Sequence, residues 1–562
     1  MGMRRRTGSA VSWSRRVVVA CASVLALLLV WLALVAPDRP DRLVPGAFLR
    51  IPVEVLVLAG LVLLLPRGPR RVLTVVTGVL LGLLTVVRLL DLGFYGVLDR
   101  PFDPLTDAGQ VGSAVDFVRQ SVGPAAASFA VVGGALLALA LVVCLPLCLG
   151  RLARVVRRHR VRSAWTLATL AIAWTASAGL GLTIVPHVPI ASADAGRLAV
   201  EHVRATAAHL REQTTFDAAV AADRFRVPAA SDLIPLRGKD VLVAFVESYG
   251  RVAVEGSSSR GVQAVLEAGT RRLQARGYSA RSAFLRSPTF GGGSWLAHAT
   301  LQSGLWVDNQ RSYDRLLSGD RTTLSSAFGR AGWRTVALLP ADRQPWPEGK
   351  AFYEFDEVYD GSSLGYAGPD FGFSTMPDQY ALWKLHQKEL ARPGRAPVMA
   401  EIDLASSHAP WAPLPGMVDW DTLGDGSIFE QVHDRAQTAE ALWRRREDVP
   451  RAYLTSIEYS LTALVSFVER YGDDNLVLVL LGDHQPATIV SGFGGNHDVP
   501  ITVISRDRTV VDSVSSWGWQ EGMRPGAGAP VWRMDAFRDR FLGVFEQPGL
   551  VGRSTPASRP RP

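Results

Sequence analysis

Cysteine is scarce in this chain and absent from its larger half. The three cysteines among 562 residues, Cys21, Cys144 and Cys148, all lie within long apolar runs. Residues 226–545, which have the composition of an ordinary globular domain, contain none. This absence excludes a disulfide framework, a cysteine-rich metal site and a thiol nucleophile from that half of the chain.

The signs of a nucleic-acid partner are also missing. The net charge is +8, but many of the arginines gather at the edges of apolar runs. There is no zinc-finger spacing and no basic stripe interleaved with aromatic residues. We therefore expect no binding of nucleic acid.

Long apolar runs fill residues 1–190 instead. Each is long enough, or nearly so, to cross a hydrocarbon layer of about 30 Å as a helix. The second run carries Glu54 and is the shortest. The sequence predicts an N-terminal bundle of about five transmembrane helices, at residues 17–36, 51–66, 72–91, 125–149 and 164–185.

The arginines predict an orientation for this bundle. They precede the first run, follow the second at 67–71 and separate the fourth from the fifth at 151–162. Basic loops stay in the cytoplasm, so an odd number of spans places the chain after about residue 186 outside. We predict a multi-pass plasma-membrane protein with a cytoplasmic N-terminus and an extracellular C-terminal domain.

The rest of the chain divides by composition. Residues 190–225 have the pattern of an amphipathic helix, and the last residues are rich in proline and arginine, as disordered tails are. The expected parts are a transmembrane domain at 1–190, a connecting helix and linker at 191–234, an extracytoplasmic α/β domain at 235–545 and a disordered tail at 546–562.

Short apolar runs in the outer half, several ending in an acidic residue, indicate buried strands. Helical stretches such as 455–472 lie between them. This alternation predicts a mostly parallel sheet with helices on both faces, which binds its ligands beyond the carboxyl ends of the strands. The expected strands lie at 239–248, 333–340, 396–404, 475–483 and 500–505.

Polar residues stand at these strand ends. Glu247 ends the first strand, His408 follows the third in SSHAPW, and Asp483 and His484 follow the fourth. His497 comes shortly afterwards in GFGGNHDVP. The carboxylates of Glu247 and Asp483, together with the imidazole of His484, suit Mn²⁺ or Zn²⁺ better than Ca²⁺, which takes oxygen ligands.

Three consecutive glycines deliver Ser294 to the start of an expected helix, in SPTFGGGSWLAHATLQSGL. Glycine in an ordered element costs about 0.5–1 kcal/mol relative to alanine, so the triplet indicates a close approach to the backbone. A flexible loop before a helix with a serine N-cap is the alternative. A serine beside a metal could attack as an alkoxide, and a helix start favours a phosphate. His408 and His497 could donate to phosphoryl oxygens or protonate a leaving group, while His298 is expected to support the site.

These motifs resemble those of the alkaline phosphatase/sulfatase superfamily. The matching stretches are FVESYG, GGGSW followed by LQSGL, SSHAPW and LLGDHQP. The apolar runs before an outer domain resemble the lipoteichoic acid synthase group of phosphoglycerol transferases. The resemblance implies an alkaline phosphatase-like fold, a metal site of Glu247, Ser294, Asp483 and His484, Ser294 as nucleophile and His408 as a substrate-binding residue.

The chain departs from these families at two places. Ser294 is followed by Leu296 and His298, where sulfatases carry Pro and Arg, so a direct serine nucleophile is expected rather than formylglycine. The stretch nearest to the FWNRD of lipoteichoic acid synthases is QPWPEGKAFYEF, whose Trp346 and Lys350 are the expected substrate-binding residues.

Together these features predict a membrane-anchored, metal-dependent transferase. It would move a phosphoglycerol-like head group from a membrane lipid donor to a cell-envelope glycan or glycolipid acceptor through a covalent serine intermediate. The expected cofactor is one divalent ion, Mn²⁺ first, with Zn²⁺ or Mg²⁺ as alternatives. A phosphatase, phosphodiesterase or sulfatase-like hydrolase on the same scaffold remains open, as does a non-catalytic envelope-binding protein.

Overall fold

The computed structural model describes residues 7–107, 123–186, 188–226 and 233–545, and also positions 112, 115, 118 and 119. The tail expected at 546–562 and residues 227–232 of the expected linker lie outside the described residues. The chain forms two compact units. The first comprises described residues of Met1–Val111 and Ala125–Arg211, and the second those of Gly112–Pro124 and Glu212–Pro562.

The first unit is built on five long or apolar helices: α1 (Thr7–Val35), α2 (Val53–Leu64), α3 (Arg67–Leu98), α5 (Pro124–Arg158) and α6 (Arg160–Gly179). Three of them, α1 from Arg16 onwards, α3 and α5, are long and apolar enough to cross a membrane. The 12 residues of α2 extend only about 18 Å, and α6 begins with charged residues. Among the described residues there are thus three candidate spans, where five were expected.

Two glycines let α3 and α5 approach closely. A Cβ atom on Gly78 would lie 2.4 Å from Cα of Pro146, and one on Gly82 would lie 2.8 Å from Cα of Val142. Helices in lipid gain little from hydrophobic burial against one another, so they associate through such small residues spaced four apart.

The second unit contains a nine-stranded sheet in the order β12-β6-β11-β10-β5-β9-β7-β8, with β13 also paired to β6. The five strands from β10 to β8 run parallel. β11 is antiparallel to both β10 and β6, whereas β6 pairs with β12 antiparallel and with β13 parallel. The predicted α/β class with a mostly parallel sheet is therefore confirmed, with an antiparallel side in addition. The bounds are β5 (Asp240–Val246), β6 (Ser279–Arg286), β7 (Arg334–Leu339), β8 (Glu357–Asp360), β9 (Val398–Leu404), β10 (Leu476–Gly482), β11 (Asp498–Ser505), β12 (Gln520–Glu521) and β13 (Val531–Arg533).

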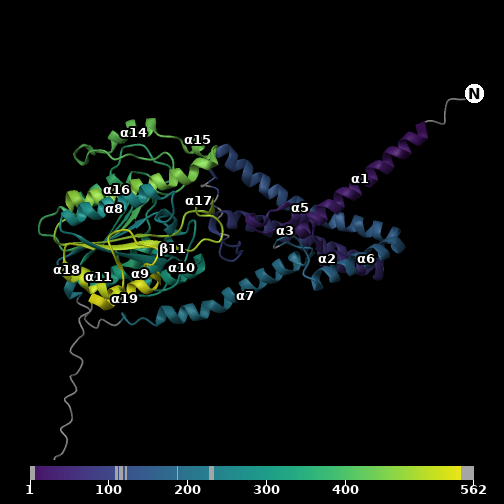
Figure 1. The fold of residues 1–562 in the computed structure, drawn as a ribbon, viewed down its shortest axis with the longest axis horizontal. Helices are drawn as coiled ribbons and strands as arrows, with labels where there is room; N and C mark the ends of the chain where they lie inside the picture. Colours follow the sequence, from purple (N-terminus) through teal and green to yellow (C-terminus); the bar gives the residue numbers. More distant parts are fainter. Residues whose placement is uncertain are drawn as a thin grey trace, which may run out of the picture. The chain divides into compact units, whose positions relative to one another are not determined.

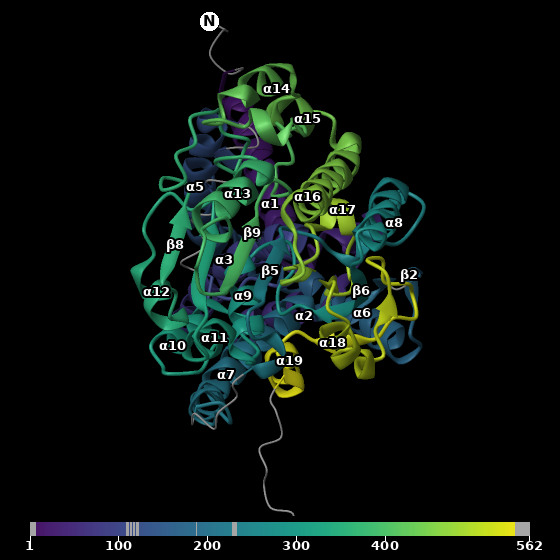
Figure 2. The same cartoon turned by 90° about the vertical axis from the view of Figure 1, so that its left-hand side faces the viewer.

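Helices cover both faces of this sheet because the central strands are apolar on both faces. Every residue of β5 is buried. Leu242, Ala244 and Val246 pack in the cluster that holds α8 (Arg260–Ala275) and α16 (Val449–Tyr471). The alternate residues, such as Phe245, face a second cluster built from α9 (Ser294–Ser303), α11 (Leu324–Arg330), α18 (Arg508–Ser513) and α19 (Ala536–Phe545). Figure 1 shows these two groups on opposite sides of the sheet, and Figure 2 shows β8, β9, β5 and β6 in their order across it.

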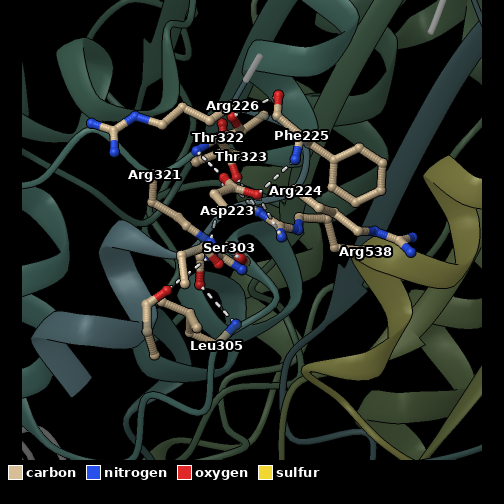
Figure 3. A network of polar contacts seen from close by, with 12 residues as sticks. Asp223, Arg224, Phe225, Arg226, Ser303, Leu305, Arg321, Thr322, Thr323 and Arg538 are labelled. Carbon is tan, nitrogen blue, oxygen red and sulfur yellow. Dashed lines mark hydrogen bonds and ion pairs between the residues drawn. The ribbon is translucent and has the colours of Figure 1, made fainter. Parts of the chain in front are cut away.

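A buried network of charges joins the end of α7 (Asp194–Ala221) to α9 (Figure 3). Asp223 and Arg538 form an ion pair of 3.2 Å in which both side chains are fully buried. Arg321 donates to the carbonyl of Ser303, the last residue of α9, at 3.0 Å. It also donates to two carbonyl groups at the end of α7, at 2.9 and 3.0 Å. The helix that carries Ser294 is therefore anchored at its far end.

Replacing Arg538 by alanine is expected to lower the free energy of unfolding by about 3–5 kcal/mol, because it leaves the Asp223 charge buried without its main partner. Thermal unfolding of the full chain in detergent, followed by tryptophan fluorescence, measures the loss. Arg444→Ala is the matched control, since its pair with Glu440 is exposed at 74% and 63% and is worth less than about 1 kcal/mol. Equal losses in the two variants would contradict burial as the cause.

Candidate active site

The expected site residues stand at one edge of the sheet. Glu247 follows β5, and Asp483 and His484 follow β10. These two strands are parallel neighbours whose last residues, Val246 and Gly482, are paired. Their carboxyl ends therefore place the residues that follow side by side, where parallel sheets bind ligands.

The glycine loop brings Ser294 to the same edge. Gly291, Gly292 and Gly293 all have positive φ, at 70°, 156° and 83°, which only glycine adopts at little cost. The loop is held in place, because the amide of Gly291 donates to the carbonyl of Gln485 at 2.8 Å. Gly293 is the N-cap of α9, and no side chain caps this helix. The amide groups of its first turn are thus oriented as in sites that bind phosphate.

Two of the predicted residues contact the Ser294 hydroxyl, and the third, Asp483, lies beside one of them. Ser294 Oγ donates to Glu247 Oε2 at 2.9 Å and lies 3.2 Å from His484 Nε2. His484 Nε2 is 3.3 Å from Glu247 Oε1 and 3.5 Å from Asp483 Oδ2. Glu247, Asp483 and His484 form a group with ligand atoms close enough to hold one metal ion.

The arrangement of lone pairs fits a shared cation. His484 Nδ1 lies 2.8 Å from the carbonyl of Gln485, so in the neutral imidazole, the form that binds a metal, Nδ1 carries the proton and Nε2 presents a lone pair. The Ser294 hydroxyl has one proton, which its contact with Glu247 uses, so its contact with Nε2 brings two acceptors together. Asp483 Oδ2 is buried and has no hydrogen-bond partner among the described residues. Oxygen and nitrogen ligands about 2.1 Å from one ion are themselves about 3.0–3.4 Å apart, close to the 2.9–3.5 Å that separates these atoms.

The pKa shifts of the site residues also favour a bound cation. Burial, with Glu247 nearby, raises the pKa of Asp483 to about 7. Burial alone would lower the pKa of His484, but Asp483 and Glu247 raise it to about 9. The pocket thus favours a proton on His484 and disfavours two bare carboxylates, and a divalent cation relieves both conditions.

Ser248 is a site residue that sequence reasoning missed. Its amide donates to Asp483 Oδ1 at 2.7 Å and its hydroxyl donates to Glu247 Oε1 at 2.9 Å. Its φ of 57° is left-handed, a conformation that costs a non-glycine residue about 1–2 kcal/mol. The hydroxyl of Tyr453 donates to its carbonyl at 2.9 Å. Only the structure reveals that this turn links the two carboxylates.

The two further histidines lie on loops at this edge. His408 follows β9, stacks on Phe373 with ring centroids 3.7 Å apart, and contacts the carbonyl of Ala409 through Nδ1. The preceding Ser407 donates to the carbonyl of Glu247 at 2.7 Å. His497 precedes β11; its carbonyl accepts from the amide of Ser287 at 2.9 Å, and its ring lies beside that of Phe290.

The expected substrate-binding pair Trp346 and Lys350 lies at the start of α12 (Pro347–Tyr353), outside the group of metal-type ligands. Trp346 packs against the cluster that contains Leu296 of α9. Lys350 forms an ion pair of 3.8 Å with Glu357 of the edge strand β8.

Replacing Gly482 tests whether the ends of β5 and β10 must approach closely for the site to bind metal. A Cβ atom there would lie 1.9 Å from the carbonyl oxygen of Tyr249, so Gly482→Ala must push Asp483 and His484 away from Glu247. We expect the loss of about one bound divalent ion per chain relative to the wild type and a stability loss of about 1–3 kcal/mol from overpacking. Elemental analysis of the purified chain measures the first. Gly528→Ala, with no atom within 4 Å of its added Cβ, is the control, and normal metal content in both variants would contradict the geometry.

Comparisons with known proteins give structural neighbours only. Neither a protein-family model nor a curated protein sequence matches this chain. Among solved structures, the chain is similar to the lipoteichoic acid synthase LtaP of Listeria monocytogenes, with 13% identity over 56% of this chain and 73% of that one, at a TM-score of 0.34.

Two other neighbours are transferases by name. The phosphoglycerol transferase GacH of Streptococcus pyogenes, solved in complex with sn-glycerol-1-phosphate, is 13% identical over 59% of this chain and 84% of that one, at a TM-score of 0.35. The C-terminal periplasmic domain of the phosphoethanolamine transferase EptC of Campylobacter jejuni is 12% identical over 55% and 89%, at a TM-score of 0.34.

Proposed function

We propose that this chain is a membrane-anchored phosphotransferase that moves a phospho-alcohol head group from a lipid to a cell-envelope hydroxyl through Ser294. The observation that carries the proposal is the position of the Ser294 hydroxyl, 2.9 Å from Glu247 Oε2 and 3.2 Å from His484 Nε2, at the uncapped start of α9. A nucleophile, a proton acceptor and phosphate-binding amides thus meet at one point.

In the first half of the reaction, Ser294 Oγ attacks the phosphorus of a lipid phosphodiester. Its proton passes to Glu247 Oε2, which it already contacts. The bond between phosphorus and the lipid oxygen breaks, and the head-group phosphate stays on Ser294. We assign the protonation of the departing lipid oxygen to His408, whose Nδ1 faces the carbonyl of Ala409 and whose Nε2 is left for the reaction.

In the second half, an acceptor hydroxyl attacks the phosphoserine. His408, now deprotonated, takes the proton of this hydroxyl, and the bond between phosphorus and Ser294 Oγ breaks. The proton held by Glu247 returns to the serine oxygen. Both half reactions therefore use the same two proton carriers and restore the starting state.

Glu247, Asp483, His484 and Ser294 would hold one divalent cation. Such an ion supplies Lewis acidity, which lowers the pKa of a bound hydroxyl and stabilises negative charge on phosphoryl oxygens. Mn²⁺ is our first choice, with Zn²⁺ or Mg²⁺ as alternatives, because the donor set combines one nitrogen with oxygens.

A lipid donor explains why the catalytic unit is attached to membrane helices, since tethering keeps the site near the bilayer surface. We propose that α6 also crosses, and that α2 crosses together with the extended residues 51–52 and 65–66 at its two ends, which gives five spans with the N-terminus inside. With only α1, α3 and α5 crossing, the arginines at 67–71 and 151–162 would both lie outside, against the positive-inside rule. With five crossings both clusters lie inside and the second unit outside.

Product analysis tests the proposed reaction. The full chain is incubated with vesicles that contain phosphatidylglycerol or phosphatidylethanolamine labelled in the head group, with and without a glycolipid acceptor. We expect label on the acceptor, with diacylglycerol formed in equal amount. Free head-group phosphate as the main product, even with acceptor present, would show a hydrolase on this scaffold.

A further inference from the structure

A second group of metal-type ligands lies beside the proposed active site. His298, Glu401 and Asp403 each present a ligand atom, and these atoms lie within 4.8 Å of one another. His298 is on α9, four residues after Ser294, and is therefore about 6 Å further along the helix axis. Nothing in the proposed reaction uses these three residues.

The fold brings them together from two elements. Glu401 and Asp403 are two apart on β9, so their side chains share one face of the sheet. They pair with Val243 and Phe245 of β5, which face α9. The ring of His298 stacks on Phe245, with centroids 3.8 Å apart and an interplanar angle of 16°. This stacking fixes the imidazole above the two carboxylates.

The spacing of these atoms matches that of ligands to one ion. His298 Nδ1 lies 3.1 Å from Glu401 Oε1 and 3.4 Å from Asp403 Oδ1. Ligand atoms about 2.1 Å from a cation are about 3.0–3.4 Å apart. The same separations occur among Glu247, Ser294 and His484.

The group also has too little positive charge of its own. Glu401 and His298 are 5% and 8% exposed, whereas the Asp403 side chain is 29% exposed, and a buried carboxylate such as Glu401 is costly without compensating charge. Among the described residues, Glu401 and Asp403 form ion pairs with His298 and none with arginine or lysine. Gln302 donates to Glu401 Oε2. Asp403 Oδ1 is buried and has no hydrogen-bond partner in the described part of the chain, although it points toward His298.

We infer that His298, Glu401 and Asp403 bind a second divalent cation, of the Mn²⁺ or Zn²⁺ class, one helical turn from Ser294. One nitrogen and carboxylate oxygens are the ligands that these ions accept. The ion neutralises the two carboxylates and ties α9 to β9. It thereby holds the helix that carries the nucleophile against the sheet, and it is separate from the ion proposed at Asp483 and His484.

The metal content of the full chain tests this inference. The detergent-solubilised protein, free of affinity tags, is equilibrated with Mn²⁺ or with Zn²⁺, and bound metal is counted by elemental mass spectrometry. We expect two ions per wild-type chain and one in Glu401→Gln, in Asp403→Asn and in His298→Asn. Asp483→Asn should also keep one, and the Glu401→Gln/Asp483→Asn double variant none.

Glu389→Gln is the matched control. Glu389 is a carboxylate with 1% side-chain exposure that pairs with Arg334 and accepts from Tyr359, so this variant should keep two ions. A wild-type chain with one ion, unaffected by Glu401→Gln but lost in Asp483→Asn, would overturn the second site and leave the proposed function standing. A single ion that Glu401→Gln removes and Asp483→Asn keeps would support the second site and count against the first. Two ions in folded Glu401→Gln, Asp403→Asn and His298→Asn variants would also overturn the second site.

Discussion

The Ser294→Ala variant is expected to lose lipid phosphodiester turnover by at least about 10³-fold, because no other group takes over the attack on phosphorus. The change removes one oxygen atom, which among the described residues contacts Glu247 and His484. The fold should therefore stay intact. Head-group transfer from labelled vesicles, measured for the full chain, gives the ratio of rates.

Two further measurements distinguish the loss of the nucleophile from the loss of the metal site. Ser294→Thr keeps a hydroxyl at the same place and should retain measurable turnover. Ser294→Ala should still bind metal, because Glu247, Asp483 and His484 remain. Turnover by Ser294→Ala within tenfold of wild type would contradict a covalent role for this residue.

The Asp483→Asn variant is expected to lower the affinity for the metal at this site by more than about 100-fold and to reduce turnover about as far as Ser294→Ala does. Asparagine keeps an acceptor for the amides of Ser248 and His484, both at 2.7 Å from Asp483 Oδ1, but it loses the charge that faces the cation. Calorimetric titration with Mn²⁺ and Zn²⁺ measures the affinity.

The metal-free form of this variant should also melt at a higher temperature than metal-free wild type at pH 8. The pKa of Asp483 is raised to about 7 by burial and by Glu247, above the value of about 3.9 in unfolded chains. A raised carboxyl pKa gives stability at low pH that is lost as the pH rises through 7, so the charged form at pH 8 costs stability. Asparagine avoids this cost, and a lower melting temperature would show that Asp483 has a structural role.

The central strands could be predicted because burial on both faces of the sheet requires apolar residues along the whole strand. β5 and β10 are buried on both faces, so they appear as nearly continuous apolar runs. β6 reads SARSAFLR, with only its second half fully buried, and such a polar start gave no strand signal. The antiparallel pairing of β11 with both β10 and β6 depends on this missed strand.

The membrane helices show where composition is insufficient. The run expected as a span at 51–66 contains the helix α2, which has only 12 residues because Pro52 and Pro66 flank it. Proline lacks the amide that would extend a helix. The run at 164–185 forms α6 together with the basic residues before it, which lowers its apolar character.

At the site, the parallel strands explain both what sequence reasoning found and what it missed. Glu247, Asp483 and His484 follow apolar runs, so their position at one edge could be anticipated. Ser248 carries no signal, because its role depends on a left-handed turn. Glu401 and Asp403 did carry one, since two acidic residues two apart within a buried strand are unusual, but their partner His298 comes from another element.

The covalent intermediate is the most direct test of the account. The full chain is mixed with vesicles of labelled phosphatidylglycerol or phosphatidylethanolamine without acceptor, quenched in acid, digested and examined by mass spectrometry. A head-group phosphate on the peptide that contains Ser294, absent from Ser294→Ala and discharged when acceptor is added, is the predicted result. Turnover of the same lipid with Ser294 never modified, or with the phosphate on a different side chain, would contradict it.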